Sequence, residues 1–306
     1  MRIRVLGSAA GGGFPQWNCG CPNCAGVRRG VVRATPRTQE SIAVSADGHD
    51  WFLLNASPEI RSQIEGFAAL HPRARRDSPI AGILLTNGDL DHCLGLLSLR
   101  ESQPLAVYAT ERVHAGFVEH NALYATLQRF AGQVTWHPLH PGRVQELLLG
   151  DGRGSGLRVE PIAVAGQPPL HLRKRFEPSA EDNIGLRIFA PASPVALLYL
   201  SGVAGPTRAL LDALESATCI FFDGTFWTSD ELIALGLGER RAEDMAHWPI
   251  GGPQGSLAAL THLRAGRKFF IHVNNTNPIL RDDSPERAAV TAAGWEVAHD
   301  GLELQI

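Results

Sequence analysis

The sequence of 306 residues lacks the long apolar segments of a membrane protein. No stretch approaches the ~20 uninterrupted apolar residues that a membrane helix needs, so we expect no membrane span. The first seven residues, M-R-I-R-V-L-G, alternate like a short strand and lack the apolar core and cleavage site of a signal peptide. We therefore expect a cytoplasmic protein.

An excess of positive charge is also missing. The chain has 28 Lys+Arg and 31 Asp+Glu, a formal net charge of −3, which argues against a nucleic-acid-binding protein with a broad basic face. Apolar residues make up 44% and charged residues 19%, which is a globular composition and not that of a disordered chain. The sequence shows no fixed repeat, low-complexity segment or convincing linker that would divide residues 1–306, and its length allows either one domain or two.

Common nucleophile and phosphate-binding motifs are absent. The sequence contains no G-x-S-x-G elbow and no Walker-type phosphate loop. Residues 11–13, G-G-G, follow a strand pattern, but a proline and a cysteine-rich segment come next where a dinucleotide fingerprint requires a helix. Nucleotide cofactor binding is therefore not indicated.

Short apolar runs bounded by Gly, Pro, Asn and Asp predict strands, and the segments between many of them predict helices. The predicted strands are 2–7, 40–46, 51–55, 80–86, 104–109, 157–164, 184–189, 195–201, 219–223, 268–273 and 295–298. The predicted helices are 58–70, 92–102, 111–130, 206–216, 255–265 and 285–293. Consecutive strands in the first third and alternation later favour two packed mixed sheets with helices outside them over one doubly wound parallel sheet.

Three of the five cysteines fall within six residues, C-G-C-P-N-C. Cys19, Cys21 and Cys24 can occupy three corners of a tetrahedron, which suits a structural Zn²⁺ ion. The fourth ligand must come from elsewhere, and a histidine is the expected donor. Reduced thiols without a metal are the alternative, although clustered exposed thiols oxidise readily.

The segment T-N-G-D-L-D-H directly follows a predicted strand. Asn87, Asp89 and Asp91 alternate and can share one face of an extended segment, and His92 would then open a helix. These are metal-capable side chains, but an Asx-rich turn in which Asp89 or Asp91 caps the helix is the alternative.

Three further residues are candidates for a functional site. His272 ends a predicted strand and is followed by three amide side chains and a proline, I-H-V-N-N-T-N-P. Asp223 ends another apolar strand, and His247 lies in a loop bounded by Gly and Pro. For Asp223 and His247 a structural role is about as consistent with the sequence as a functional one.

These motifs resemble two nested families. The segment T-N-G-D-L-D-H resembles the H-x-H-x-D-H metal motif of the metallo-β-lactamase superfamily, with Asn87 and Asp89 at the first two histidine positions and Asp91-His92 at the end. The opening strand, C-G-C-P-N-C, F-D-G-T-F-W, M-A-H-W-P-I-G-G-P-Q-G-S-L and I-H-V-N-N-T-N-P resemble more narrowly the PqqB family of pyrroloquinoline quinone (PQQ) biosynthesis. The matching blocks span residues 3 to 280.

The resemblance implies an α/β fold of one domain, the metallo-β-lactamase-like αββα four-layer sandwich. It implies a structural zinc at the three clustered cysteines and a separate active-site metal at Asp91, His92 and His272. Because His272 lies where related members place ligands for either metal, it could also complete the zinc site.

The resemblance also implies an Fe²⁺- and O₂-dependent hydroxylase that acts on the tyrosine ring of a Glu–Tyr-derived PQQ precursor, with other PQQ-pathway proteins as possible partners. A carrier that transports PQQ or its precursor and a metallohydrolase of the phosphodiesterase type are the alternatives. The hydrolase is disfavoured because two motif histidines are replaced, residues 164–168 contain no third histidine, and residues 201–205 contain no aspartate.

One carboxylate and two histidines can hold a single iron and leave positions open for O₂ and substrate, as in facial-triad oxygenases. Asn87 and Asp89 would then lie near the metal as acid/base or orienting groups. The remaining catalytic candidates are Asp223 and His247, and His247 would replace His272 if that residue served zinc.

Overall fold

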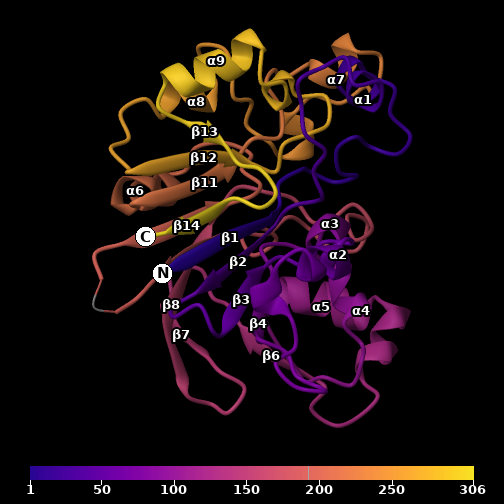
Figure 1. The fold of residues 1–306 in the computed structure, drawn as a ribbon, viewed down its shortest axis with the longest axis vertical. Coiled ribbons are helices and arrows are strands. Elements are labelled where there is room, and N and C mark those ends of the chain that lie inside the picture. Colours follow the sequence, from indigo (N-terminus) through magenta and orange to yellow (C-terminus); the bar gives the residue numbers. More distant parts are fainter. Residues whose placement is uncertain (192) are drawn as a thin grey trace.

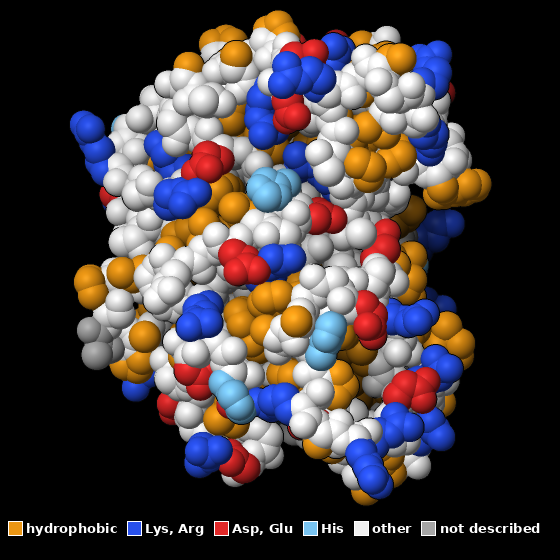
Figure 2. Space-filling model, in the orientation of Figure 1, with side chains coloured by type: hydrophobic (Ala, Val, Ile, Leu, Met, Phe, Trp, Pro, Cys, Tyr) orange, Lys and Arg blue, Asp and Glu red, His pale blue; other side chains and the backbone are white. Residues whose placement is uncertain are grey.

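The computed structural model describes residues 1–191 and 193–306 as two seven-stranded sheets packed together, with helices on their outer sides (Figure 1). This arrangement confirms the αββα sandwich. None of the described helices combines the length and the apolar character needed to cross a membrane. On the face that Figure 2 shows, acidic and basic side chains are interspersed.

The two sheets have similar sizes and mixed strand directions. In spatial order the first consists of β14 (Glu303–Gln305), β1 (Arg2–Gly7), β2 (Ser41–Ser45), β3 (Trp51–Leu54), β4 (Ile80–Leu84), β5 (Leu105–Ala109) and β6 (Val134–Pro138). The second consists of β13 (Glu296–Val297), β12 (Arg267–Ile271), β11 (Cys219–Asp223), β10 (Ala196–Leu200), β9 (Ile184–Phe189), β8 (Gly154–Ala163) and β7 (Gln145–Leu148). Because β14 pairs with β1, both ends of the chain are held in the first sheet.

Helices cover the outer face of each sheet. Those that follow strands of the first sheet are α2 (Ile60–Glu65), η1 (Ala68–Leu70), α3 (Leu90–Cys93), α4 (Gly95–Ser98), α5 (Glu111–Glu119) and η2 (Ala122–Leu127). The second sheet is accompanied by α6 (Arg208–Ser216), α7 (Glu231–Ala234), η3 (Glu243–Met245), α8 (Ser256–Ala259), η4 (Pro278–Leu280) and α9 (Pro285–Ala292). Helix α1 (Pro22–Arg28) lies near α7 in Figure 1.

Several boundaries differ from the sequence-based prediction. Strands β6, β7 and β14 and helix α1 were not predicted, because they are short or half-exposed and carry weak periodicity. The predicted helix 111–130 ends at Glu119 and continues as the 3₁₀ segment η2, and the predicted helix 255–265 is reduced to α8. The Gly-rich residues 150–156 include the turn between β7 and β8 and the first residues of β8, so this segment joins two neighbouring strands.

Hydrophobic packing explains why the sheets stack. One cluster of buried side chains lies between the sheets and includes Phe52, Tyr199 and Phe221. Separate clusters join each sheet to its own helices. Strands β10 and β11 are buried along their whole length, as is typical of strands covered on both faces.

The topology brings the functional candidates to one end of the sandwich. Strands β3, β4 and β5 are parallel, and so are β10, β11 and β12. The carboxyl ends of parallel strands meet at the same edge of a sheet, where ligand sites of α/β proteins usually form. Asn55, Thr86, Ser201, Asp223 and His272 all lie at or just beyond such strand ends.

Candidate metal centres

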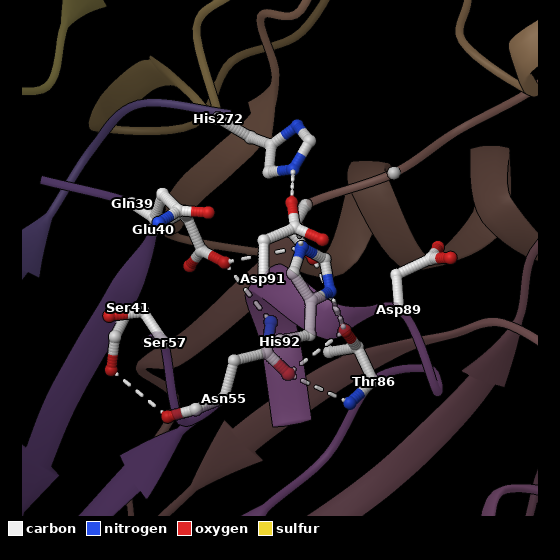
Figure 3. A network of polar contacts seen from close by, with 12 residues as sticks. Gln39, Glu40, Ser41, Asn55, Ser57, Thr86, Asp89, Asp91, His92 and His272 are labelled. Atoms are coloured by element: carbon white, nitrogen blue, oxygen red, sulfur yellow. Dashed lines mark hydrogen bonds and ion pairs between the residues drawn. The ribbon is translucent and has the colours of Figure 1, made fainter. Parts of the chain in front are cut away.

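Asp91, His92 and His272 form one cluster although 181 positions separate Asp91 from His272. Asp91 and His92 lie in the short helix α3, which opens a few residues after β4, and His272 is the first residue after β12. Figure 3 shows His272 pointing from the second sheet toward Asp91, with His92 beside them. The packing of the two sheets therefore completes this cluster.

The spacing of the three side chains suits one metal ion. Asp91 Oδ2 lies 3.2 Å from His272 Nε2 and 3.7 Å from His92 Nε2, and ligand atoms about 2.1 Å from a shared ion are themselves roughly 3–3.5 Å apart. His92 Nε2 is buried and has no hydrogen-bond partner among the residues that the structure describes, which is costly unless a ligand satisfies it. The backbone of Gly11 closes one side, since a Cβ there would lie 3.2 Å from Asp91 Oδ2. These residues fit a bound metal.

A buried polar network supports His92 through the Nδ1 atom of its ring. Its Nδ1 lies 3.1 Å from the hydroxyl of Thr86, and Asn55 Oδ1 accepts both the backbone N–H and the hydroxyl of Thr86 at 2.9 and 3.0 Å. Asn55 Nδ2 donates to Glu40 Oε2 at 3.0 Å. Burial raises the pKa of Glu40 well above its ordinary value, and Glu40 Oε2 lies 3.8 Å from His92 Nε2.

Asp223 supports the second-sheet side of the site. It is fully buried, and its carboxylate accepts hydrogen bonds from His247 Nδ1 at 2.7 Å, Val203 N at 2.9 Å and both the N–H and hydroxyl of Thr225 at 3.0 and 2.6 Å. Burial opposes its ionisation, but the charge of His247 holds the pKa of Asp223 below its ordinary value. The His247 ring stacks on that of His272, with centroids 5.5 Å apart. Both oxygens of Asp223 accept hydrogen bonds, so the orientation of this carboxylate is fixed. Asp223 in turn fixes the His247 ring, which faces the site.

The pKa of His247 moves in the opposite direction from that of His92. Burial lowers the pKa of both, and for His92 it is the dominant cause and brings the value to about 4. For His247 the carboxylate of Asp223 outweighs burial and raises the pKa. His92 is therefore neutral and able to coordinate a metal at physiological pH, whereas His247 holds a proton more readily.

Asp89 and Asn87 have different roles in the turn before α3. Asp89 occupies the N-cap position, but its side chain makes no capping hydrogen bond, so capping does not explain its presence. Burial and the nearby charge of Asp91 raise the pKa of Asp89 to about 6, and Figure 3 shows its carboxylate turned away from the other labelled side chains. Asn87 accepts the Asp89 N–H at 2.9 Å and donates to Asn183 at 3.4 Å. Asn87 thus holds the turn, and Asp89 offers a carboxyl suited to proton exchange near neutral pH.

Backbone strain is concentrated around this site. Asn55, Ala246 and His272 have positive φ values of 64°, 63° and 56°, a conformation that costs a non-glycine residue about 1–3 kcal/mol. Asn55 belongs to the network behind His92, His272 is a candidate ligand, and Ala246 directly precedes His247. Strain of this kind persists where the surrounding structure holds a functional geometry.

The clustered cysteines form a second, separate centre. The sulfurs of Cys19, Cys21 and Cys24 lie within 4.8 Å of one another, and all three residues are buried. The backbone N–H groups of Cys21 and Cys24 point at the sulfurs of Cys19 and Cys21, each at 3.4 Å. Asn275 Nδ2 lies 3.1, 3.7 and 3.4 Å from the three sulfurs in chain order. The side chain at the fourth corner is therefore an amide.

The segment that carries Asn275 is held from both sides. Asn23 Nδ2 donates to the carbonyl oxygens of residues 275, 276 and 277. On the other side Glu231 accepts the Thr276 hydroxyl at 2.5 Å and the Trp227 N–H at 2.7 Å. Burial raises the pKa of Glu231 to about 7. Glu231 lines a groove of about 460 Å³ between α1 and α7.

The structure sorts the predicted site residues into two centres. His272 groups with Asp91 and His92, and also with Asp223 and His247, while within the described residues the cysteines form a group without it. Among the described residues no histidine groups with the three cysteines, and the amide of Asn275 faces their sulfurs instead. The sequence analysis did not identify five supporting residues, which are Glu40, Asn55, Thr86, Ser201 and Thr225. Thr86 and Thr225 stand within T-N-G-D-L-D-H and F-D-G-T-F-W, and Asn55 and Ser201 could have been suggested by their places directly after β3 and β10.

Comparison with known proteins is consistent with this architecture. Residues 50–273 match the model of the beta-lactamase superfamily domain. The chain is 45% identical to coenzyme PQQ synthesis protein B of Azotobacter vinelandii over 100% of both chains, and 44% identical to that of Nitrosococcus oceani over 99% of both. It superposes with a TM-score of 0.92 on the crystal structure of Zn²⁺-bound PqqB from Methylobacterium extorquens, at 42% identity and with 100% of both chains covered.

Proposed function

The chain belongs to the coenzyme PQQ synthesis protein B family, within the beta-lactamase superfamily, and from this we propose that it acts in PQQ biosynthesis as an iron-dependent hydroxylase. The proposed substrate is the tyrosine ring of a Glu–Tyr-derived precursor, and O₂ is the cosubstrate. Other PQQ-pathway proteins would supply this precursor or take up the product.

The observation that carries the proposal is the donor set of the first centre. Asp91, His92 and His272 offer one carboxylate and two imidazoles, and such a set binds Fe²⁺ while leaving coordination positions open. A dinuclear zinc hydrolase requires more imidazoles. At the positions of the two missing histidines, Asn87 is engaged in the turn and Asp89 is a carboxylate. This donor set favours a mononuclear centre.

Residues around the metal would accept protons from the substrate and donate protons to it. When bound, Fe²⁺ in such a centre supplies the activation of O₂. Asp89, with its raised pKa of about 6, would accept the phenol proton of the tyrosine ring. His247, kept more basic by Asp223, would donate a proton. Placing one oxygen atom in a ring C–H bond and releasing the other as water consumes two electrons, so the reaction needs an external reductant.

Arg173 is the residue that we assign to a substrate carboxylate. The segment around it lies against the metal-binding turn, because a Cβ at Gly88 would come within 3.2 Å of Pro169. Arg173 Nε donates to the carbonyl of Pro168 at 3.2 Å, and its charge acts on Asp89 and lowers that pKa against the effect of burial. A Glu–Tyr-derived precursor carries carboxylates, which guanidinium groups bind well.

We propose that the second centre is a structural zinc site. Cys19, Cys21 and Cys24 would supply three thiolates, and the carboxamide of Asn275, whose Nδ2 faces the sulfurs, would turn its oxygen to the ion as the fourth ligand. The backbone N–H groups aimed at the sulfurs would stabilise the thiolates. A zinc held in this way ties the segment after Gly13 to the segment after His272, and both border the first centre.

Metal content combined with turnover tests the proposal. Protein prepared without oxygen and loaded with Fe²⁺ is mixed with the Glu–Tyr-derived precursor, O₂ and a reductant. O₂ uptake and a product one oxygen atom heavier are expected, and His92→Ala should show neither while its cysteine-bound zinc is retained. Precursor binding without O₂ uptake would replace the proposal by a carrier, and two zinc ions at the first centre with phosphodiester cleavage would replace it by a hydrolase.

A further inference from the structure

Both histidines of the first centre bond through Nδ1 to a threonine hydroxyl. His92 Nδ1 lies 3.1 Å from Thr86 Oγ1, and His272 Nδ1 lies 2.8 Å from Thr225 Oγ1. Thr86 follows β4 of the first sheet and Thr225 follows β11 of the second, so the same arrangement arises from two unrelated segments. Because a hydroxyl carries a single proton, the direction of each bond depends on where the threonine sends that proton.

The surroundings of Thr225 determine this direction on the second sheet. Asp223 Oδ1 lies 2.6 Å from the hydroxyl oxygen, and the carbonyl oxygen of His272 lies 3.0 Å from it. Both groups only accept, since the nearby donors and the charge of His247 keep Asp223 ionised. The hydroxyl proton goes to one of them, so Thr225 accepts from His272 Nδ1–H. On the other side of the ring His272 Nε2 lies 3.2 Å from Asp91 Oδ2, which only accepts, so a metal ion would take the place of the proton between these two atoms.

The network behind Thr86 leads to the same result. Asn55 Oδ1 accepts the backbone N–H of Thr86, a group that can only donate, and this sets the orientation of the amide. Asn55 Nδ2 consequently faces Glu40 Oε2. The hydroxyl of Thr86 therefore donates to Asn55 Oδ1 at 3.0 Å and accepts from His92 Nδ1–H. Ser201 Oγ, 3.3 Å away, adds a further acceptor or donor and leaves the bond from His92 unchanged.

We propose that Thr86 and Thr225 are positioning residues that hold a proton on Nδ1 of both metal-binding imidazoles. Nε2, on the side of Asp91, is then the nitrogen that each ring presents to a metal ion. The hydrogen bond at one ring nitrogen decides which nitrogen is free for a metal. Free histidine favours a proton on Nε2, so without the threonines each ring would present a proton where the ion must bind. This inference rests on the proposed role of Asp91, His92 and His272 as ligands.

The first test uses metal-free wild-type protein. The ¹⁵N chemical shifts of the imidazole nitrogens are measured at alkaline pH, where histidine rings are neutral. We expect the shifts of His92 and His272 to report a protonated Nδ1 in both rings, and an unprotonated Nε2 in His92, where that atom has no hydrogen-bond partner among the described residues. An unprotonated Nδ1 in either ring would overturn the proposal for that threonine. Since no metal is present, this result does not depend on which ion the protein binds.

The second test compares metal affinities of matched variants. Thr86→Val and Thr225→Val keep the shape of the side chain and remove the hydroxyl, whereas the Ser variants keep the hydroxyl. Thr110→Val is the control, because Thr110 is also fully buried and its hydroxyl donates to Glu181 O and accepts from Val113 N without bonding to a histidine ring. Fe²⁺ affinity is measured anaerobically by competition with a chromogenic chelator. We expect each Val variant at 86 or 225 to bind Fe²⁺ about 10–100-fold more weakly.

The remaining outcomes separate this inference from the proposed function. The Ser variants and Thr110→Val should retain wild-type Fe²⁺ affinity. Wild-type affinity in the Val variants, or an equal loss in the Ser variants, would contradict a role for the hydroxyl in setting the tautomer. If a Val variant does not fold, the Ser variants and the wild-type ¹⁵N shifts still decide. If His92→Ala keeps its Fe²⁺, the proposed metal centre is wrong, whatever the tautomers are.

Discussion

Replacing Glu231 with Gln should change the pH dependence of stability by an amount that the structure allows us to work out. Glu231 is 7% exposed, and burial raises the pKa of its carboxyl from 4.5 to about 7. A difference of roughly 2.5 units at about 1.4 kcal/mol per unit corresponds to about 3 kcal/mol. Because the folded pKa is the higher one, the folded protein binds more protons in this range. The contribution of Glu231 is therefore complete below about pH 4.5 and is lost as the pH rises through about 7.

The matched comparison isolates this contribution from those of all other groups. The free energy of unfolding of zinc-loaded protein is measured by urea denaturation from pH 4.5 to 8. The introduced glutamine side chain stays neutral, so the stability of Glu231→Gln relative to wild type should increase by about 3 kcal/mol across that range. Any constant cost of the new amide at Thr276 or Trp227 cancels from the slope. Glu239→Gln, on the exposed side of the same region, should show a flat difference. A flat difference for Glu231→Gln would refute the reasoning.

Three further predictions concern the metal centres and the substrate. Cys21→Ser should lose the zinc and several kcal/mol of stability, because metal-binding energy becomes folding energy; full zinc retention in metal analysis with unchanged melting would reject a structural zinc. Asp91→Asn should weaken Fe²⁺ binding, since the amide is a poorer donor than the carboxylate, and wild-type turnover in this variant or in His92→Ala would show that the ligand assignment is wrong. Arg173→Gln should raise KM for the precursor at least tenfold, the loss expected when a charged hydrogen bond of about 1.5–3 kcal/mol is removed, with little change in kcat. The exposed Arg175→Gln should leave KM unaltered, and equal effects of the two variants would argue against a specific carboxylate contact.

Local patterns in the sequence were sufficient for much of the fold. The strands with dense Val, Ile, Leu and Phe were found because burial on both faces leaves long apolar runs, as in β10 and β11. The helix α9 was also found, because Ser284 and Pro285 mark its first turn. Strands β6, β7 and β14 were not predicted, since half-exposed edge strands need few apolar residues. The partner of β14 is moreover β1, at the other end of the chain.

For the site, the sequence by itself determined the chemical types and their local spacing: three thiols on one turn, and a carboxylate next to a histidine at the start of α3. Spacing of this kind is a local property, because neighbouring residues share one stretch of backbone. The sequence also indicated His272, but it left open which metal that residue would serve.

Only the tertiary structure decided how these segments combine. The pairing of parallel strands and the stacking of the two sheets bring His272 to Asp91, leave Asn275 facing the cysteines, and place Asp223 under His247. Glu40, Asn55, Thr86 and Thr225 gain their roles in the same way, because each is an ordinary polar residue until its hydrogen-bond partners arrive from other strands. The direction of a shared proton depends on every partner around it, and those partners come together only when the chain has folded.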